Sequence, residues 1–378
     1  MAPDVLYVQV GRVSRSAVLE SRWPEAVPKA RAYVATWRAD EPSAPDPALA
    51  RRLATAYREM RSAVQLAGLQ LDVDCPTRSL AAYGEFLEVL RGELGTGERL
   101  SITALLDWFV PGTRVRDVLA PVDEYVPQFY DTRRGGPSAA IAAPIDAARW
   151  APVFNGLGQP YRIGIATFGR VQRVRANSAR EIFRDVGLFD LAAAGLRPVE
   201  TLVNGPRERV VVYDVRTTLG PELRPGDRLE AVVPTAESVR MASIAARAFG
   251  GRCVGVVFFR WPARGETLVM TPDEIARALA GRTPATAPRI IAGEGSCVAR
   301  SCADLSLELQ DRFLRQPLSL RIEASAAVDY HMPGASVVAL RQTGPREFAL
   351  TLPPGPVVRT VALGRFFSRR MARYRIAR

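Results

Sequence analysis

The chain has 378 residues, of which 48% are hydrophobic, and its 51 basic and 39 acidic side chains give a net charge of +12. This apolar content is ample for a buried core, and the length predicts two domains or one large barrel with an appendage. No apolar segment is long enough to span a membrane, because the longest apolar run near the end of the chain, 253–259, has only seven residues.

The pattern of apolar residues predicts a succession of strand-then-helix units. Strands are expected over 5–13, 32–40, 68–76, 100–109, 123–131, 161–171 and 254–262. Helices are expected over 48–66, 77–94, 115–119, 146–153 and 236–249, with Thr77 as the N-cap of the second. Repeated units with apolar strands predict a parallel sheet, most simply a TIM-type (β/α)8 barrel over 1–282, in which seven strands are evident.

The strand over 68–76 is unusual because it carries an amide and two carboxylates. Residues two apart share a face of a strand, so Gln70, Asp72 and Asp74 point one way and alternate with apolar residues. Burying such a face is costly without a functional reason. In a (β/α)8 barrel, polar residues at the C-terminal end of a strand lie where these enzymes keep their chemistry.

Two segments depart from the strand-then-helix pattern. Residues 172–235 predict an insertion before the last barrel strand, with strands at 210–216 and 229–233. After a proline-bearing linker at 283–288, polar and apolar residues alternate in four short segments, over 305–310, 318–325, 336–342 and 347–353. This alternation predicts a small antiparallel β-sandwich domain over 289–378.

The positive charge is unevenly distributed. Lys29 is the only lysine, so nearly all of the charge is arginine. Six arginines lie between 365 and 378, and without them the net charge falls to +6. We expect contact between this arginine-rich C-terminus and an anionic surface, and we do not expect nucleic-acid binding.

With one histidine and four cysteines that form no metal-binding pattern, the sequence predicts no metal site and no cofactor. His331 is the only histidine, which excludes His-rich zinc sites, and we expect it at the surface or in a turn. Cys75 and Cys253 lie on or beside strands and are expected to be small buried residues. Cys297 and Cys302 are close enough to close a small disulfide loop, which would favour an oxidising compartment; the spacing leaves both states open.

Several motifs occur together in a characteristic order. They are Gly68-Leu-Gln-Leu-Asp-Val-Asp-Cys-Pro with its following helix, and then the segments 100–105, 122–124 and 257–262. In this order they resemble an uncharacterised bacterial family, the domain-of-unknown-function family numbered thirty-one forty-two. The resemblance covers roughly residues 60–265.

The chain also resembles, more distantly, the family-eighteen (chitinase-like) glycoside hydrolases, whose fourth strand ends D-x-x-D-x-D-x-E. The last three acidic positions correspond to Gln70, Asp72 and Asp74. Residues 128–131 resemble the M-x-Y-D strand of that family, and 163–170 resemble its G-x-P-x-Y-G-R strand. In this sequence Asp74 is one methylene shorter than the family's glutamate, and Gln70 replaces an aspartate.

This resemblance implies a glycoside hydrolase acting on a bacterial or environmental polysaccharide, with amino sugars among its candidate units. Asp74 would donate the proton to the leaving oxygen, and like-charge repulsion from Asp72 would disfavour loss of that proton beforehand. Tyr130 and Asp131 would orient an N-acetyl group of the substrate. Alternatively, Asp107 on the adjacent strand would act as a second carboxylate.

The side chains expected to contact the substrate are polar or aromatic, namely Gln70, Gln128, Trp37, Trp108, Trp261, Arg170 and Arg260. Trp261 is included through the resemblance alone. In the alternative interpretation, the acids pair with Arg38, Arg170 or Arg260 in a buried polar layer, and the aromatic residues are barrel packing.

Three functions therefore follow from the sequence. The first is a glycoside hydrolase, the second a non-catalytic carbohydrate-binding barrel, and the third a basic interaction protein that uses its arginine-rich C-terminus. No signal peptide opens the chain, yet a polysaccharide substrate would suit a periplasmic or secreted protein, and a cytoplasmic location stays open.

Overall fold

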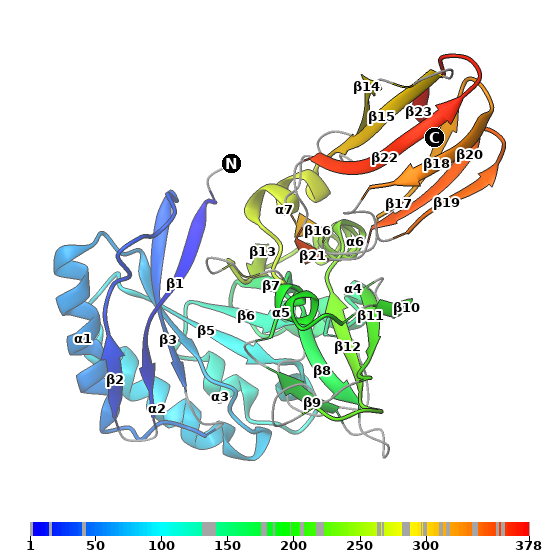
Figure 1. Ribbon diagram of the computed structural model, residues 1–378. Helices are drawn as coiled ribbons and strands as arrows, with labels where there is room; N and C mark the ends of the chain where they lie inside the picture. The colour runs from blue at the N-terminus through cyan, green and yellow to red at the C-terminus, as the bar shows by residue number, and fades with distance from the viewer. Residues whose placement is uncertain are drawn as a thin grey trace. The chain divides into compact units, whose positions relative to one another are not determined.

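The structure is a computed structural model (Figure 1). It describes residues 3–14, 17–39, 43–130, 141–174, 180–183, 186–196, 198–204, 208–216, 223–262, 266, 268–281, 288–295, 297, 301–309, 313–314, 318–334, 339–352, 355–356 and 360–377. The chain divides into two compact units. The first consists of Met1–Asp131, Ala142–Ala166 and Met241–Phe259, and the second of Thr132–Ile141, Thr167–Arg240 and Arg260–Arg378. Among the described residues, no helix is both long and apolar enough to cross a membrane.

The first unit is built on one eight-stranded sheet of order β13-β7-β6-β5-β4-β3-β1-β2 (Figure 1). Seven of these strands are parallel to their neighbours, and β2 is antiparallel to β1. The strands are β1 (Val5–Val13), β2 (Val18–Ser21), β3 (Ala32–Ala39), β4 (Gly68–Asp72), β5 (Arg99–Leu105), β6 (Glu124–Gln128), β7 (Tyr161–Ala166) and β13 (Cys253–Phe259). The seven parallel strands are the seven predicted from the sequence, which confirms the α/β class.

Helices connect the parallel strands. They are α1 (Leu49–Ala63), α2 (Leu80–Glu93), α3 (Val115–Leu119), α4 (Ala147–Asn155) and α6 (Ala236–Arg247). In α2 the apolar residues recur every three or four positions, so they form one stripe along the helix. This stripe is buried in the same hydrophobic cluster as Leu69 and Leu71, the alternate residues of β4. Each fully buried leucine contributes roughly 2 kcal/mol to the stability of this layer.

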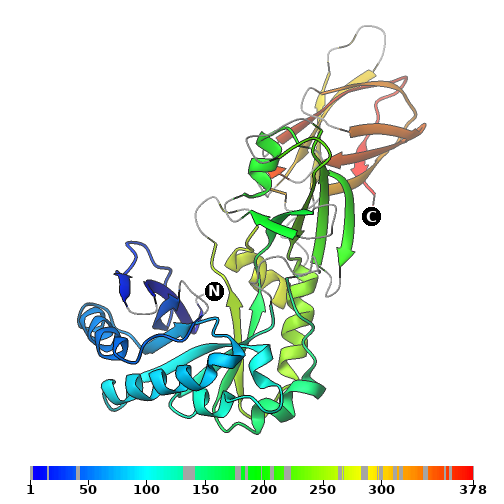
Figure 2. The same ribbon diagram turned by 90° about the horizontal axis from the view of Figure 1, so that it is seen from below.

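The parallel sheet is strongly curled (Figure 2). Tyr7 on β1 and Glu124 on β6 are separated by four strand pairings, which would place them about 19 Å apart in a flat sheet. Nevertheless the Tyr7 hydroxyl donates to Glu124 Oε1 over 2.7 Å, and Arg162 Nε on β7 donates to the same oxygen over 3.0 Å. In the described residues no backbone ladder joins β13 to β1 or β2, so the sheet is a curled half-barrel.

The second unit contains the predicted insertion, a five-stranded antiparallel sheet of order β10-β11-β12-β8-β9. Its elements are β8 (Arg170–Val174), β9 (Arg180–Phe183), α5 (Leu188–Ala193), β10 (Pro198–Asn204), β11 (Glu208–Asp214) and β12 (Arg228–Val233). Leu188 and Leu191 of α5 share a buried cluster with Val171, Val211 and Leu229 of the sheet. One face of this sheet is therefore covered by α5.

The C-terminal part is the predicted antiparallel β-sandwich. One sheet has the order β14-β15-β22-β18 and the other β19-β20-β17-β23. The strands are β14 (Arg289–Glu294), β15 (Ser301–Glu308), β17 (Leu318–Ala324), β18 (Val328–Pro333), β19 (Ala339–Gly344), β20 (Glu347–Leu352), β22 (Thr360–Ser368) and β23 (Tyr374–Ile376), with the short pair β16 (Phe313–Leu314) and β21 (Gly355–Pro356) besides. Leu305, Leu307 and Phe366 of one sheet share a core with Phe348 and Leu350 of the other. Helix α7 (Pro272–Leu279) precedes the sandwich.

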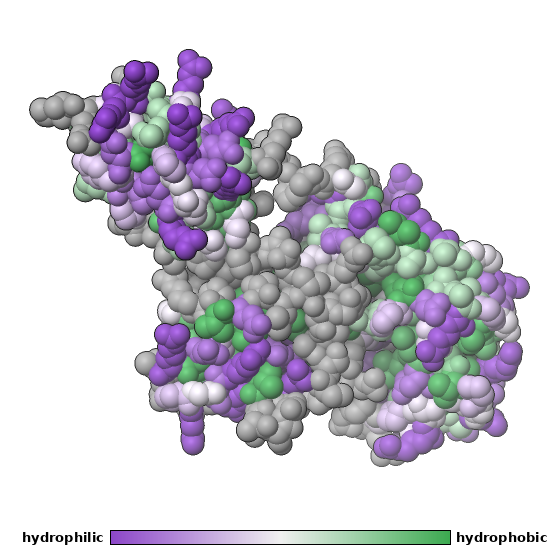
Figure 3. All heavy atoms as spheres, turned by 90° about the vertical axis from the view of Figure 1, so that its right-hand side faces the viewer, coloured by the Kyte–Doolittle hydropathy of each residue, from purple (hydrophilic) through white to green (hydrophobic). Residues whose placement is uncertain are grey.

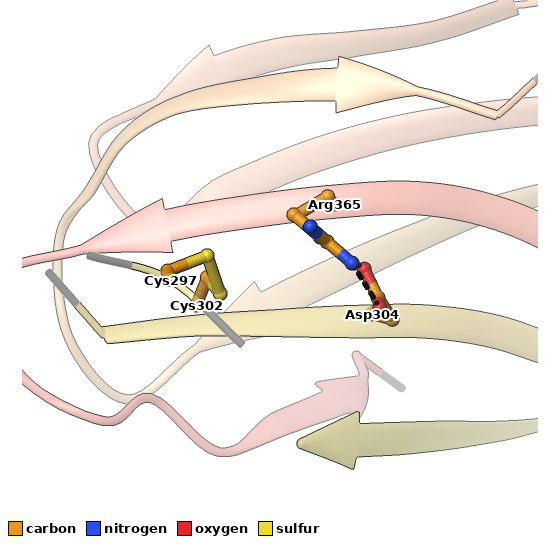
Figure 4. Close-up of a disulfide and its surroundings, with 4 residues drawn as sticks. All are labelled: Cys297, Cys302, Asp304 and Arg365. Carbon is orange, nitrogen blue, oxygen red and sulfur yellow. Dashed lines mark hydrogen bonds and ion pairs between the residues drawn. A yellow bond between two sulfur atoms is a disulfide. The ribbon is translucent and has the colours of Figure 1, made fainter. Parts of the chain in front are cut away.

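The sandwich contains Cys297, Cys302 and His331, whose states were predicted from the sequence. Cys297 and Cys302 form a disulfide beside the bidentate ion pair of Asp304 and Arg365 (Figure 4). We expected His331 at the surface or in a turn, but it lies within strand β18. Its ring is partly buried and stacks on Phe366, at 5.5 Å between ring centroids, because alternation turns it toward the core.

Three predicted boundaries are wrong for local reasons. Thr77 is not the N-cap of α2, because a 3-10 turn over Thr77–Ser79 precedes that helix. The strand expected over 100–109 ends at Leu105, and Leu106–Phe109 form a second 3-10 turn. The strand expected over 161–171 ends at Ala166, after which the chain leaves the parallel sheet and Arg170 begins β8 of the insertion.

Candidate active site

The inner face of the curled sheet is lined by polar side chains. Because strand residues alternate between faces, Thr36, Gln70 and Ser101, which are paired in register on β3, β4 and β5, point to the same side. All three are buried, as are Thr103, Glu124 and Gln128 on the same face. The apolar residues between them belong to the helix-covered core on the other side. The sequence alternation thus predicted the inward direction of Gln70 and Asp72 correctly.

Asp72 is held by side chains from three neighbouring strands. The Thr103 hydroxyl donates to Asp72 Oδ1 over 2.7 Å, and Gln128 Nε2 donates to the same oxygen over 3.3 Å. Arg38 Nε lies 3.9 Å from Oδ2. The carboxylate side chain is only 17% exposed, so these contacts compensate for lost hydration. Asp72 therefore has a fixed orientation at the carboxyl end of β4.

Tyr130 brings Asp74 into the same cluster. The pKa of Tyr130 is raised well above its ordinary value, first by burial and then by the negative charges of Asp72 and Asp74, while the Arg38 guanidinium acts in the opposite direction. Asp74 itself follows the end of β4 and is partly buried. The buried Tyr130 hydroxyl therefore stays protonated and lies within the electrostatic range of two carboxylates. The structure thus brings Asp72, Asp74, Gln128 and Tyr130 together.

The Tyr130 ring is clamped between two neighbours. One face stacks on Phe259 of β13, with ring centroids 5.3 Å apart and planes 10° from parallel. At Gly164 on β7, an added Cβ would lie 3.3 Å from Tyr130 Cε1 and 3.0 Å from the Pro127 carbonyl oxygen. Glycine at position 164 is therefore what lets the ring approach β7 this closely.

We expect Gly164→Ala to displace the Tyr130 ring, lowering the free energy of unfolding by about 1–2 kcal/mol through overpacking. Urea unfolding measures this loss. Gly92→Ala is the matched control, because Gly92 is exposed in the last turn of α2 and nothing lies within 4 Å of an added Cβ. Alanine there should leave stability unchanged or raise it by up to ~1 kcal/mol. Equal effects of the two substitutions would show that the ring is not clamped.

Two buried polar atoms of this cluster have no hydrogen-bond partner among the described residues. They are Gln70 Nε2 and Gln128 Oε1, and each residue is only 4% exposed. The other amide atom of each is occupied, since Gln70 Oε1 accepts from the Thr36 hydroxyl and Gln128 Nε2 donates to Asp72. An unpartnered buried polar atom costs about 1–3 kcal/mol, so the pair offers one donor and one acceptor to a bound molecule.

Two of the predicted tryptophan contacts are wrong. Trp37 and Trp108 are fully buried, with no exposed ring face for a sugar. Trp37 alternates with Thr36 and Arg38 and so points into the helix-covered core. Trp108 lies in the 3-10 turn after β5, where its indole nitrogen donates to the Cys75 carbonyl oxygen over 2.8 Å and its ring packs on Tyr83. Both are packing residues, as the alternative interpretation held.

The other two predicted acids differ in position. Asp107 is exposed in the 3-10 turn after β5, and its Oδ2 accepts a hydrogen bond from Thr77 over 3.2 Å. The expectation that it ends the strand is therefore wrong. Asp131 lies outside the described residues, so its predicted role stays a prediction.

The remaining predicted residues belong to the second unit. Arg170 is buried at the start of β8, where its Nε donates to Gln172 Oε1 over 3.1 Å. Arg260 forms a two-pronged ion pair with Glu266, through Nη1 at 2.9 Å and through Nη2. Trp261 is 41% exposed. Among the described residues, Arg38 pairs with Asp72, whereas Arg170 contacts Gln172 and Arg260 pairs with Glu266.

Thr103 was not identified from the sequence as a hydrogen-bond donor to Asp72. Arg38 was considered only as an ion-pair partner that would neutralise the acids. The alternation of Ser101 and Thr103 on β5 was the signal for the first, since both had to face inward with Gln70. Among the described residues, no three His, Cys, Asp or Glu side chains form a group that could hold a metal ion. The cluster can donate protons and hydrogen bonds to a neutral polar ligand.

A comparison with known protein families gave a match to part of the chain. Residues 31–192 match the family model described as "Domain of unknown function (DUF3142)". A comparison with curated proteins gave no match.

Solved structures similar to this chain include chitinases and a spore enzyme. The C-terminal domain of a putative chitinase from Desulfitobacterium hafniense is 14% identical, with a TM-score of 0.45, over 66% of this chain and 79% of that one. The Bacillus cereus spore cortex-lytic enzyme SleL is 15% identical, with a TM-score of 0.44, over 67% and 60%. A Group IV chitinase from Ostrinia furnacalis is also 15% identical, with a TM-score of 0.44, over 67% and 80%. The predicted resemblance to the DUF3142 family is thus confirmed over residues 31–192.

Proposed function

We propose that this protein is a glycoside hydrolase-like protein that binds an oligosaccharide at the inner face of its curled sheet. The observation that carries the proposal is the cluster at the carboxyl end of β4, where Thr103 and Gln128 hold Asp72 and where burial, together with the charges of Asp72 and Asp74, raises the pKa of Tyr130. Two carboxylates at the carboxyl end of β4 and a hydroxyl donor just after β6, on parallel strands of one sheet, are groups that suit cleavage of a glycosidic bond. The resemblance of positions 70, 72 and 74 to the family-eighteen motif supports the same activity.

In the proposed reaction, Asp74 protonates the glycosidic oxygen as the carbon–oxygen bond breaks and positive charge develops at the sugar carbon. Asp72, held by Thr103 and Gln128, carries the negative charge that stabilises this centre. Tyr130 donates its hydroxyl hydrogen to an oxygen of the substrate. Water then adds to the carbon and returns a proton to Asp74, which restores the starting state. The resemblance assigns Asp131 to an N-acetyl group of an amino sugar.

The same proposal includes the finer fold, a TIM-type (β/α)8 barrel that surrounds this inner face. Seven parallel strands with helical connections support it, and so do the contacts from Tyr7 on β1 to Glu124 and Arg162 on β6 and β7. These side chains meet across the inside of the sheet, as residues at the N-terminal end of a barrel do. Placing the sugar at the opposite end keeps the site on the face where barrel enzymes bind substrate.

A non-catalytic carbohydrate-binding protein is the second candidate, and Gln70 favours it. An amide at this position cannot exchange a proton with Asp72, whereas the aspartate of the family-eighteen motif could. Gln70 Nε2 and Gln128 Oε1 instead provide an uncharged donor and acceptor, which suit sugar hydroxyl groups. Binding without cleavage by the wild-type protein would select this candidate.

Measuring both binding and product release on a panel of amino-sugar and neutral oligosaccharides tests the proposal. Asp72→Asn removes the charge that holds Arg38 and the preferred acceptor of Thr103. We expect it to weaken oligosaccharide binding at least tenfold, since hydrogen bonds to charged groups contribute about 1.5–3 kcal/mol. Asp117→Asn is the control, because in the described part of the chain Asp117 forms a partly exposed ion pair with Arg114, away from the inner face of the sheet. Failure of the wild-type protein to bind any oligosaccharide would refute both candidates.

A further inference from the structure

The C-terminal sandwich carries an apolar strip on the solvent side of its sheet β14-β15-β22-β18. On β22 the side chains of Leu363 and Phe366 enter the core, so Phe367 faces outward. In register with Phe367 are Cys302 on β15 and Tyr330 on β18. The row therefore runs from the disulfide, across Phe367, to Tyr330 on the edge strand. We call Phe367, Tyr330 and the neighbouring Met332 the outer strip.

The outer strip presents two flat rings, and two of its three members are exposed. Tyr330 and Phe367 stack with ring centroids 4.3 Å apart and planes 13° from parallel. Tyr330 is 46% exposed and Met332 58% exposed, values that mark them among the most exposed large apolar side chains described. Stacked aromatic rings of this kind offer an apolar surface and, on tyrosine, a polar edge. That combination suits a ligand with flat C–H faces and hydroxyl groups, as sugar rings have.

Two exposed arginines, Arg369 and Arg370, come directly after β22 in the chain, close in sequence to Phe367 of the outer strip. After Ser368, which pairs with Val328 of the edge strand, come Arg369 and Arg370 in an exposed turn. Neither they nor Arg373 has an ion pair among the described residues, whereas Arg365 pairs with Asp304 and Arg375 with Glu323. In the sequence, residues 289–378 contain 14 arginines and seven acids, so they hold +7 of the net charge of +12. The upper part of Figure 3, which is the sandwich, shows hydrophilic side chains projecting around smaller apolar areas.

Two features of this face favour a polysaccharide over a lipid surface or a nucleic acid. The Asp304–Arg365 ion pair lies in register with Met332 of the outer strip, so insertion of the strip into lipid would bury two charges. The adjacent disulfide of Cys297 and Cys302 is typical of an oxidising compartment, outside the cytoplasm, where anionic polysaccharides are exposed.

We propose that the outer strip and the turn arginines Arg369 and Arg370 form a second binding site, which takes an anionic polysaccharide. The rings of Tyr330 and Phe367 lie against sugar faces, and the guanidinium groups pair with carboxylate groups along the polymer. This site does not depend on the proposed cleavage at Asp74. It would hold the protein on a charged polymer while the half-barrel acts on an oligosaccharide.

Affinity electrophoresis of the full chain in gels containing polygalacturonate tests the proposal, with fully methyl-esterified polygalacturonate as the uncharged version of the same polymer. We expect retention by the acid form, loss of retention in 0.5 M salt (an ionic strength of about three times the physiological one), and little retention by the ester. Arg369→Gln with Arg370→Gln should weaken retention about fivefold, since exposed ion pairs contribute roughly 0.2–1 kcal/mol each. Tyr330→Ala should weaken it about tenfold through lost ring contact.

The control with matched charge is Arg341→Gln with Arg346→Gln, which removes two exposed arginines from the other sheet or its turn. Equal weakening by both double substitutions would overturn the proposal, because net charge alone would then explain retention. Tighter binding of single-stranded DNA or of anionic phospholipid vesicles, with the same dependence on Tyr330, would overturn it in favour of those ligands. Asp72→Asn should leave retention unchanged. If it abolished retention while the turn variants did not, the polymer would be bound in the half-barrel, which contradicts the second site and supports the proposed function.

Discussion

Replacing Asp74 with asparagine is expected to abolish glycoside cleavage while preserving oligosaccharide binding. An asparagine side chain has no acidic proton, and a positioned general acid contributes about 10²–10⁴-fold to such a reaction. Binding should persist because Thr103 and Gln128 hold Asp72 in place without Asp74. Product release from amino-sugar oligosaccharides gives the rate, and calorimetric titration gives the affinity.

The substitution Asp74→Glu provides the complementary test. Glutamate adds the methylene that this sequence lacks relative to the family-eighteen motif, so it should match or exceed the wild-type rate. Asp107→Asn is the control, since Asp107 is exposed in the 3-10 turn after β5 and its carboxylate accepts a hydrogen bond from Thr77. Cleavage at the wild-type rate by Asp74→Asn would remove Asp74 from the reaction. An equal loss in Asp107→Asn would instead make Asp107 the essential carboxylate.

Replacing Glu124 with glutamine is expected to produce the largest loss of stability. Glu124 is buried on β6, accepts from Tyr7 and Arg162, and lies 3.6 Å from Arg99 Nη2 on β5. Removing its charge leaves two arginines without their acidic partner, and Arg162 is itself only 22% exposed. Breaking a buried ion pair in this way typically costs about 3–5 kcal/mol, and we expect the lower figure because Arg99 is half exposed.

Urea unfolding followed by tryptophan fluorescence measures this loss, because Trp37 and Trp108 are buried in the helix-covered core of the same sheet and become exposed when it unfolds. Tyr7→Phe should cost about 1 kcal/mol, since it removes only one hydrogen bond. Glu25→Gln is the control, because Glu25 forms an exposed pair with Arg22 and its loss should not shift the transition. If Glu124→Gln unfolded at the wild-type urea concentration, the contacts of Glu124 across the sheet would contribute nothing to its stability.

The sequence predicted the strands and the inward faces well because both depend on local alternation. Period-two patterning on β4 and β6 was enough to place Gln70, Asp72 and Gln128 on one face. The same argument would have assigned Trp37 to the opposite face, since it alternates with Thr36. For Trp108 no such argument was available, because the 3-10 turn after Leu105 ends the alternation.

What could not be predicted depends on contacts between distant strands. Local pattern shows that Tyr7, Glu124 and Arg162 face inward, but it does not show that a curled sheet brings them within hydrogen-bond distance. The pairing of Arg38 with Asp72, and of Arg260 with Glu266, likewise depends on the tertiary arrangement. Sequence patterning offered three arginines as partners for the acids, and only the folded chain selects among them.

The contact between Tyr7 and Glu124 also bears on the order in which the chain folds. The neighbouring strands β3 and β4 are joined by the bond between Thr36 and Gln70, 34 residues apart, whereas Tyr7 and Glu124 are 117 residues apart. Closing a longer loop costs more entropy, and contacts of long sequence separation slow folding. During synthesis, β1, β3, β4 and β5 can pair in chain order before β6 exists. We therefore expect the contact between Tyr7 and Glu124 to form late, after the first four parallel strands have paired.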